Sequence, residues 1–189
     1  MDQVDETLDI LCLGEMGIGN TTSAAAICHA LYGGNAADWT GPGTGIEGKA
    51  MNAKTHIVSE AVKNYKFNDG LDVLMCLGGR ELAAIAGAII AARLKAVPVM
   101  LDGFVSTAAA SVLEATLPGA LDHCQVGHAS SEPGHRRLLK RIKKVPLLDF
   151  EMRLGEASGA ALAVSVLKAA VSCHNGMATF TEAGVSDKE

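Results

Sequence analysis

The sequence predicts an α/β fold of the doubly wound, Rossmann-like kind: a mainly parallel sheet with alanine-rich helices on both of its faces. Short apolar runs alternate with longer segments of helical period, and each run ends in a small or acidic residue. This alternation along a chain is typical of parallel sheets. Apolar residues make up 49% of the sequence and aromatic residues only 4%. We therefore expect thin helices that pack close to the sheet.

The elements can be placed from these runs. We predict an irregular, glycine-rich loop over residues 33–48, followed by a helix that carries Lys54. The last helix is expected from residue 154 to about 171, in a single domain of residues 1–178 with a tail at 179–189. The predicted strands are residues 8–13, 73–77, 97–101 and 122–126, and the helices after the last three end near residues 94, 117 and 142.

Composition excludes several classes of function. The net charge of −5 gives no reason to expect a nucleic acid or an anionic membrane as a partner. The longest apolar stretch, residues 83–92, is too short to span a bilayer. The N-terminus has no signal-peptide pattern, and the five cysteines include no C-x-x-C pair. We expect a cytoplasmic protein.

The turn at residues 14–22 is the first candidate site. It follows an apolar run and opens a helix, an arrangement in which glycines and free N–H groups bind phosphate. Glu15 lies inside the turn, which suggests a cationic or protic group beside the phosphate. Gly17 and Gly19 could also be ordinary turn glycines. The third glycine of the dinucleotide fingerprint and the GK[ST] sequence of the P-loop are both missing, so neither common nucleotide loop is matched.

Ligands of such sheets bind beyond the carboxyl ends of the strands. The predicted strands bring four residues to that edge: Glu15, Gly78, Asp102 and His128.

Three further features leave alternatives open. Glu156 stands at a predicted helix start, where a carboxylate either complements the helix dipole or serves a site. Lys54 is either a surface lysine or the cation that reaches a bound phosphate. The segment 128–135 has His and Glu at helical spacing, which could suggest a metal, but Pro133 and Gly134 interrupt the helix. Hydrogen-bonding roles at a loop are favoured there.

Several of these segments carry a resemblance to a known family. The chain resembles the nicotinate-nucleotide–dimethylbenzimidazole phosphoribosyltransferases, which build the lower-ligand nucleotide of cobalamin. The motifs follow the family's order from residue 8 almost to the end. The matching segments are residues 14–22, 39–45, 78–87, 98–104, 128–135, 154–161 and 177–180.

The resemblance implies transfer of the phosphoribosyl group of nicotinate mononucleotide to 5,6-dimethylbenzimidazole, with inversion at the anomeric carbon. It implies that Glu156 is the general base and that Glu15 faces the ribose. It also implies a homodimer, with no cofactor and no metal. The remaining substrate-binding residues that it implies are Gly17, Thr44, Lys54, Asp102, Gly103 and Ser130.

One departure from the family concerns length. The family's chains are nearly twice as long, and the N-terminal half, which carries part of the benzimidazole pocket, has no counterpart here. Two alternatives to an active transferase follow. The chain could be a non-catalytic domain that binds a nucleotide or phosphate, or a subunit that needs a separate N-terminal partner.

Overall fold

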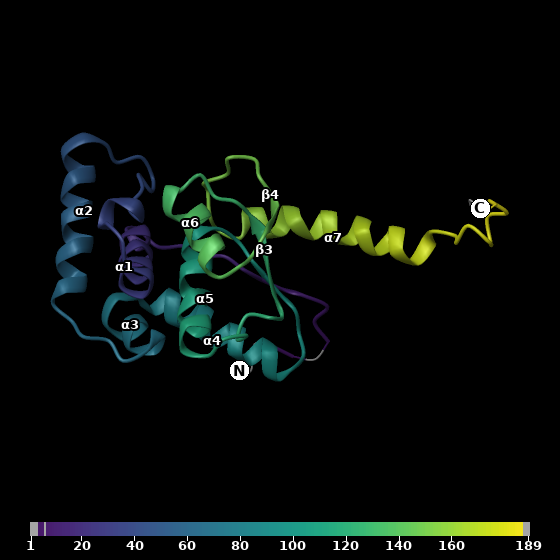
Figure 1. Cartoon of the computed structure of the whole chain (residues 1–189), viewed down its shortest axis with the longest axis horizontal. Helices are drawn as coiled ribbons and strands as arrows, with labels where there is room; N and C mark the ends of the chain where they lie inside the picture. Colours follow the sequence, from purple (N-terminus) through teal and green to yellow (C-terminus); the bar gives the residue numbers. More distant parts are fainter. Residues whose placement is uncertain (1–3, 6, 187–189) are drawn as a thin grey trace.

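The computed structural model describes residues 4–5 and 7–186. Its centre is a parallel sheet of four strands in the order β1-β2-β3-β4 (Figure 1). The predicted α/β class is confirmed. The strands are β1 (Leu11–Leu13), β2 (Val99–Leu101), β3 (Cys124–His128) and β4 (Pro146–Leu148). The helices are α1 (Asn20–Tyr32), η1 (Ala36–Asp38), α2 (Gly48–Lys63), α3 (Gly70–Leu77), α4 (Arg80–Leu94), α5 (Phe104–Thr116), α6 (Pro133–Arg141) and α7 (Ser158–Gly176).

Alternate strand residues face opposite sides of the sheet, and each side has its own core. On one side, Val99, Leu101 and Val126 belong to the large cluster that also contains the buried faces of α1, α4 and α5. On the other side, Met100 packs with residues from the first turns of α7. Helix α5 is buried through residues 104–113, and its three consecutive alanines, 108–110, are fully inaccessible. Small side chains therefore let this helix lie deep in the molecule.

The predicted strand at residues 73–77 is wrong, because this segment is the second half of α3. The side chain of Asp69 accepts a bond from the N–H of Asp72 and caps the helix. Val73 and Leu77, four residues apart, are buried, whereas Met75 is exposed, which is a helical and not an alternating pattern. Gly78 consequently follows a helix, and its predicted place at the end of a strand is also wrong.

Other element boundaries differ from the prediction. Strand β4 is missed because its apolar run covers only residues 145–148 and contains Pro146, a residue that seldom lies inside a strand. The final helix begins four residues later than predicted, at Ser158. The irregular loop over residues 33–48 contains the short helix η1.

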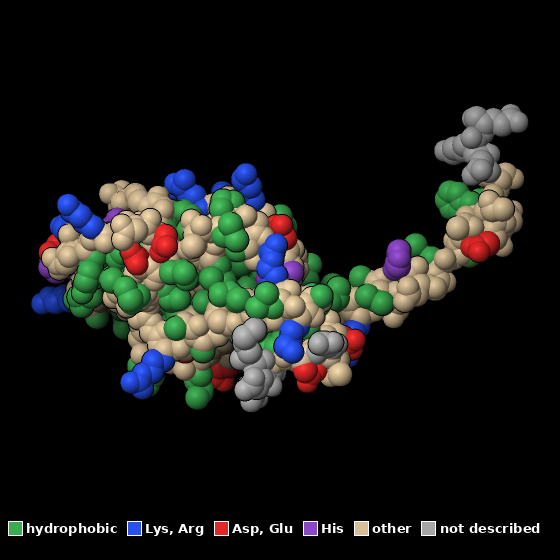
Figure 2. Space-filling model, turned by 90° about the horizontal axis from the view of Figure 1, so that it is seen from below, with side chains coloured by type: hydrophobic (Ala, Val, Ile, Leu, Met, Phe, Trp, Pro, Cys, Tyr) green, Lys and Arg blue, Asp and Glu red, His purple; other side chains and the backbone are tan. Residues whose placement is uncertain are grey.

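Helix α7 leaves the body of the molecule. Its first residues cover the sheet, and the rest projects as a single rod (Figures 1 and 2). Residues 177–186 form exposed turns beyond it. Across the described part of the chain, no helix has both the length and the apolar character that crossing a membrane would require. The apolar side chains exposed on α7 are Leu162, Val166, Leu167 and Val171.

Candidate active site at the carboxyl edge of the sheet

A cavity of about 540 Å³ opens where the four strands end. Glu15 follows β1, Asp102 follows β2, Ser130 follows β3, and Glu156 lies in the segment after β4. The structure brings all eight candidate residues to this cavity, although their roles stay predictions. The eight are Glu15, Gly17, Thr44, Lys54, Asp102, Gly103, Ser130 and Glu156.

Glu156 lies in a stretch of backbone with an uncommon conformation. Gly155, Glu156 and Ala157 have φ angles of 81°, 57° and 61°, so three successive residues are left-handed. For residues other than glycine this conformation costs about 1–3 kcal/mol each, and such strain clusters at functional sites. The Glu156 N–H donates to the Glu15 carbonyl at 3.1 Å. The backbone therefore links the two candidate carboxylates.

Close packing holds this strained segment against the turn after β1. A Cβ at Gly14 would lie 2.0 Å from the backbone nitrogen of Ala157. Only glycine allows this approach, because any side chain at position 14 would push the segment away. The glycine at the start of the phosphate-type turn thus positions the Glu156 segment.

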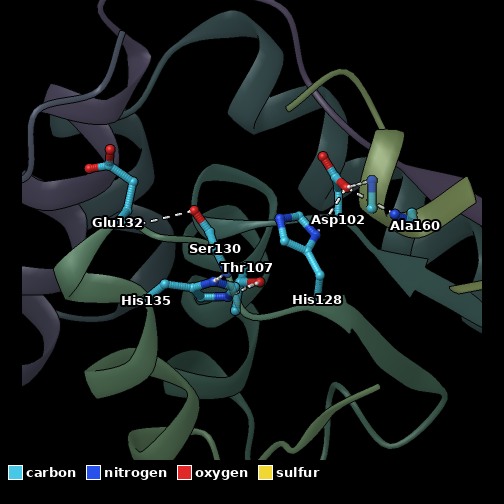
Figure 3. Close-up of polar contacts among 8 residues, drawn as sticks. Asp102, Thr107, His128, Ser130, Glu132, His135 and Ala160 are labelled. Atoms are coloured by element: carbon cyan, nitrogen blue, oxygen red, sulfur yellow. Dashed lines mark hydrogen bonds and ion pairs between the residues drawn. The ribbon is translucent and has the colours of Figure 1, made fainter. Parts of the chain in front are cut away.

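Asp102 caps α7 and lies next to a buried histidine. Its Oδ1 accepts bonds from the N–H groups of Gly159 at 2.8 Å and Ala160 at 2.9 Å (Figure 3). His128 Nδ1 is 3.4 Å from the same oxygen. Burial would raise the pKa of Asp102, but the nearby His128 and the hydrogen bonds from the N–H groups of Ala160 and Gly159 together lower the pKa below its usual value. Asp102, rather than Glu156, therefore accepts the first N–H groups of α7 as an ionised carboxylate.

Glu15 has the opposite electrostatic character. Burial raises its pKa, and the hydrogen bond that Asn20 donates to its carboxylate offsets only part of this effect. The negative charges of Asp102, Glu81 and Glu156 raise the pKa further. Glu15 consequently binds a proton, or a neighbouring positive charge, more readily than a carboxylate in water.

Some of the groups that line the cavity suit an anion. They are called the anion wall below and comprise the start of α1 after Gly19, the start of α5 after Gly103, and Lys54. Gly19, with φ 87°, precedes α1, and no side chain of a described residue caps the first N–H groups of this helix. Helix α5 begins directly after Gly103. Free N–H groups at helix starts bind phosphates and carboxylates.

Lys54 belongs to the same wall. It is buried, with 7% of its surface exposed, so the surface-lysine interpretation is wrong. Its Nζ donates to Thr21 Oγ1 at 2.9 Å and to the carbonyl of Gly41 at 2.8 Å. Burial lowers the pKa of Lys54, and the charge of Glu132 opposes this shift.

Arg153, which is not among the residues predicted from the sequence, also lines the cavity. Its Nη2 donates to the carbonyl of Gly43 at 3.1 Å and lies 4.0 Å from Glu132 Oε1. Lys54 and Arg153 are therefore two cations that line the cavity. Arg153 follows β4, whose apolar run is short and contains a proline. Its position before the Glu156 segment was the one available clue.

In the segment 128–135, both ring nitrogens of His135 form hydrogen bonds. His135 Nδ1 accepts from the Ser130 N–H at 2.9 Å, so in the neutral ring Nε2 carries the hydrogen and donates to Thr107 Oγ1 at 3.1 Å (Figure 3). Burial, together with the charge of His128, lowers the pKa of His135 to about 3. Among residues 4–5 and 7–186, no three His, Cys, Asp or Glu side chains gather closely enough to hold a metal.

Acid is expected to destabilise the protein through His135. In the unfolded chain the ring has a pKa near its ordinary value of about 6.5, whereas in the folded protein it becomes protonated only near pH 3. The free energy of unfolding therefore falls as the pH drops below 6.5, by about 2 kcal/mol between pH 7 and pH 5. Urea unfolding at both pH values measures this loss. His135→Asn, which keeps an acceptor but does not titrate, should lose less, and an equal loss in both proteins would contradict the assignment.

The fold is a parallel α/β fold. Its cavity is lined by carboxylates and, beside them, by helix N-termini and cations that can bind an anion. A family model described as phosphoribosyltransferase matches residues 1–185. The nicotinate-nucleotide–dimethylbenzimidazole phosphoribosyltransferase of Ruegeria sp. (strain TM1040) is 60% identical over 184 residues, which are 97% of this chain and 55% of that protein. The chain belongs to the nicotinate-nucleotide–dimethylbenzimidazole phosphoribosyltransferase family.

Other relatives agree. The protein of the same name from Brucella canis is 58% identical over 188 residues, 98% of this chain and 56% of its own length. The crystal structure of CobT from Thermus thermophilus superposes with a TM-score of 0.91 at 42% identity, covering 97% of this chain and 55% of that one. The chain thus spans about half the length of the relatives that it matches.

Proposed function

We propose that the chain transfers the phosphoribosyl group of nicotinate mononucleotide to 5,6-dimethylbenzimidazole, giving α-ribazole 5′-phosphate and nicotinate. One observation supports this most directly: the anion wall lines the same cavity as Glu15 and Glu156, whose backbones are hydrogen-bonded to each other. The names of the relatives supply the two substrates.

In this proposal the bond between the anomeric carbon and the pyridinium nitrogen breaks, and a benzimidazole nitrogen forms the new bond from the opposite face. The pyridinium leaves as a neutral ring nitrogen and needs no acid. The attacking base must lose its N–H proton, and Glu156 accepts it as general base. No cofactor or metal takes part.

Glu15 stabilises the positive charge that develops at the ribose as the pyridinium leaves. Support comes from its pKa, which burial and nearby carboxylates raise, because such a group gains from a neighbouring cation. The phosphate is held by N–H groups near Gly17 and Gly103, by Ser130 and by Lys54. Thr44 and Asp102 complete the substrate contacts. Much of the rate enhancement then comes from binding the nucleotide by its phosphate, so that the attacking benzimidazole and the leaving pyridinium lie in line with the anomeric carbon.

The test is incubation of the chain with both substrates. We expect nicotinate to appear only when nicotinate mononucleotide and dimethylbenzimidazole are both present, together with stoichiometric α-ribazole phosphate, as measured by liquid chromatography. Release of nicotinate without the acceptor would indicate a hydrolase. Absence of product with a folded chain would contradict activity of this chain alone.

The short coverage of the relatives supports a second candidate: a domain that binds the nucleotide but does not turn it over alone, or a subunit that needs a partner for the missing part. Calorimetric titration separates this candidate from the transferase, because it predicts binding of nicotinate mononucleotide without nicotinate release.

We also propose that the chain forms a homodimer in the cytoplasm. The apolar side chains exposed along α7 support self-association, since soluble monomers seldom leave such surfaces uncovered. The five free cysteines fit a reducing compartment. Light scattering after gel filtration gives the oligomeric state.

A further inference from the structure

Residues 40–45, named the glycine loop here, lie between η1 and α2, and Pro42, Gly43 and Thr44 of this loop line the cavity. Gly43 and Gly45 have φ angles of 55° and 118°, and the Gly45 N–H donates to the Pro42 carbonyl at 3.0 Å. The loop is a tight turn whose backbone borders the proposed phosphate site. Its position therefore affects how a nucleotide fits.

A buried carboxylate from a distant part of the chain lies beneath this loop. Glu132 Oε1 accepts from the N–H of Gly43 at 2.9 Å, across 89 residues of sequence. Its Oε2 is buried and has no hydrogen-bond partner among the described residues. A Cβ at Gly41 would lie 2.1 Å from this Oε2, so the loop backbone packs directly against the carboxylate. Burying a carboxylate oxygen without a hydrogen-bond partner costs free energy. Glu132 is nevertheless buried here, where its other oxygen holds the loop through the Gly43 N–H.

Two cations hold the same loop by its carbonyl groups. Lys54 Nζ donates to the Gly41 carbonyl, and Arg153 Nη2 donates to the Gly43 carbonyl. Arg153 lies 4.0 Å from Glu132, and the charge of Glu132 raises the pKa of Lys54. Glu132 thus binds a loop N–H and faces both of the cations that bind the loop carbonyls.

A further hydrogen bond connects Glu132 to Ser130 and not to the candidate base. The backbone N–H of Glu132 donates to Ser130 Oγ at 3.2 Å. In Figure 3 its carboxylate points away from His128 and Asp102, on the far side of Ser130. Among the described residues no hydrogen bond or ion pair joins Glu132 to Glu156, so we expect Glu132 to affect nucleotide binding and not the proton transfer to Glu156.

We propose that Glu132 is a positioning residue, which fixes the glycine loop so that the loop and its two cations can hold the phosphate of the nucleotide. This inference rests on the proposed function for the identity of the ligand. The fixing of the loop itself is independent of any ligand, and the two parts can be tested separately.

The experiment compares Glu132→Ala, which removes the acceptor for Gly43, with Glu132→Gln, which keeps one. A hydrogen bond to a charged group is worth enough to change an equilibrium by about tenfold or more. In Glu132→Ala we expect amide exchange of the glycine loop to quicken by about that factor, and the KM for nicotinate mononucleotide to rise similarly. The kcat and the KM for dimethylbenzimidazole should stay within about twofold of wild type. Glu132→Gln should recover most of the loop protection.

The exposed Glu60, which pairs with Lys63 on α2, offers a matched control, and Glu60→Gln should change neither exchange nor KM. Unchanged exchange of the loop in Glu132→Ala would overturn the proposal, as would a fall in kcat at constant KM. If Glu132→Ala fails to fold, Gly41→Ala takes its place, because its Cβ would displace the loop from Glu132. If wild type releases no nicotinate, the proposed function fails, whereas loop exchange and the Kd for the nucleotide still decide the role of Glu132.

Discussion

Glu156→Gln is expected to lower kcat/KM for phosphoribosyl transfer by about 10²–10⁴-fold, the usual contribution of a positioned general base. Glutamine has nearly the same shape but cannot accept the benzimidazole proton. The strained backbone at Glu156, its bond to the Glu15 carbonyl and its place on the cavity all remain in the variant. Steady-state nicotinate release at saturating dimethylbenzimidazole gives the number.

The Glu156 experiment needs a measure of binding beside the rate. Calorimetric titration should give nearly the same Kd for nicotinate mononucleotide in Glu156→Gln and wild type, because the anion wall is untouched. Glu60→Gln serves as the surface control and should keep full activity. Turnover by Glu156→Gln at the wild-type rate would refute the role of Glu156, whatever the Kd.

Sequence patterns predicted the parts of the fold whose signal is local. The runs at residues 8–13, 97–101 and 122–126 are each followed by a small or acidic residue. They overlap β1, β2 and β3, although the third run is only weakly apolar and its predicted end lies two residues before the end of β3. The run at residues 73–77 carried the same apolar signal but is a helix. Its buried side chains, Val73 and Leu77, belong to the core that α3 shares with α5, and a short apolar run cannot by itself distinguish a buried strand from a buried helix.

The contacts within the site depended on long-range packing and could not be read from spacing. Asp102 caps a helix that begins 56 residues later, and Glu132 holds a loop from which it is separated by 89 residues. Arg153 lies beyond a strand whose apolar run is short and contains a proline. Pairings of this kind are fixed only once the sheet has brought its strand ends together. The resemblance supplied candidate residues, and the structure supplied their neighbours.

Gly159→Ala is expected to destabilise the protein by about 3 kcal/mol or more, through overpacking and loss of a helix cap. A Cβ at Gly159 would lie 1.9 Å from Nδ1 of His128, whose buried ring sits at the end of β3. The ring cannot move freely, because its other side lies close to Gly103. The start of α7 must therefore shift, and its two bonds to Asp102 weaken.

Gly87→Ala is the matched control for Gly159→Ala. Gly87 lies in the middle of α4, and a Cβ there would meet nothing within 4 Å. The same substitution should stabilise the protein at this position by about 0.5–1 kcal/mol, because alanine favours helix. Thermal unfolding should then separate the two variants by roughly 8–16 °C, on the scale expected for a chain of this size. Equal midpoints would show that the start of α7 tolerates a side chain, and the close packing that places Glu156 two residues before this helix would have to be abandoned.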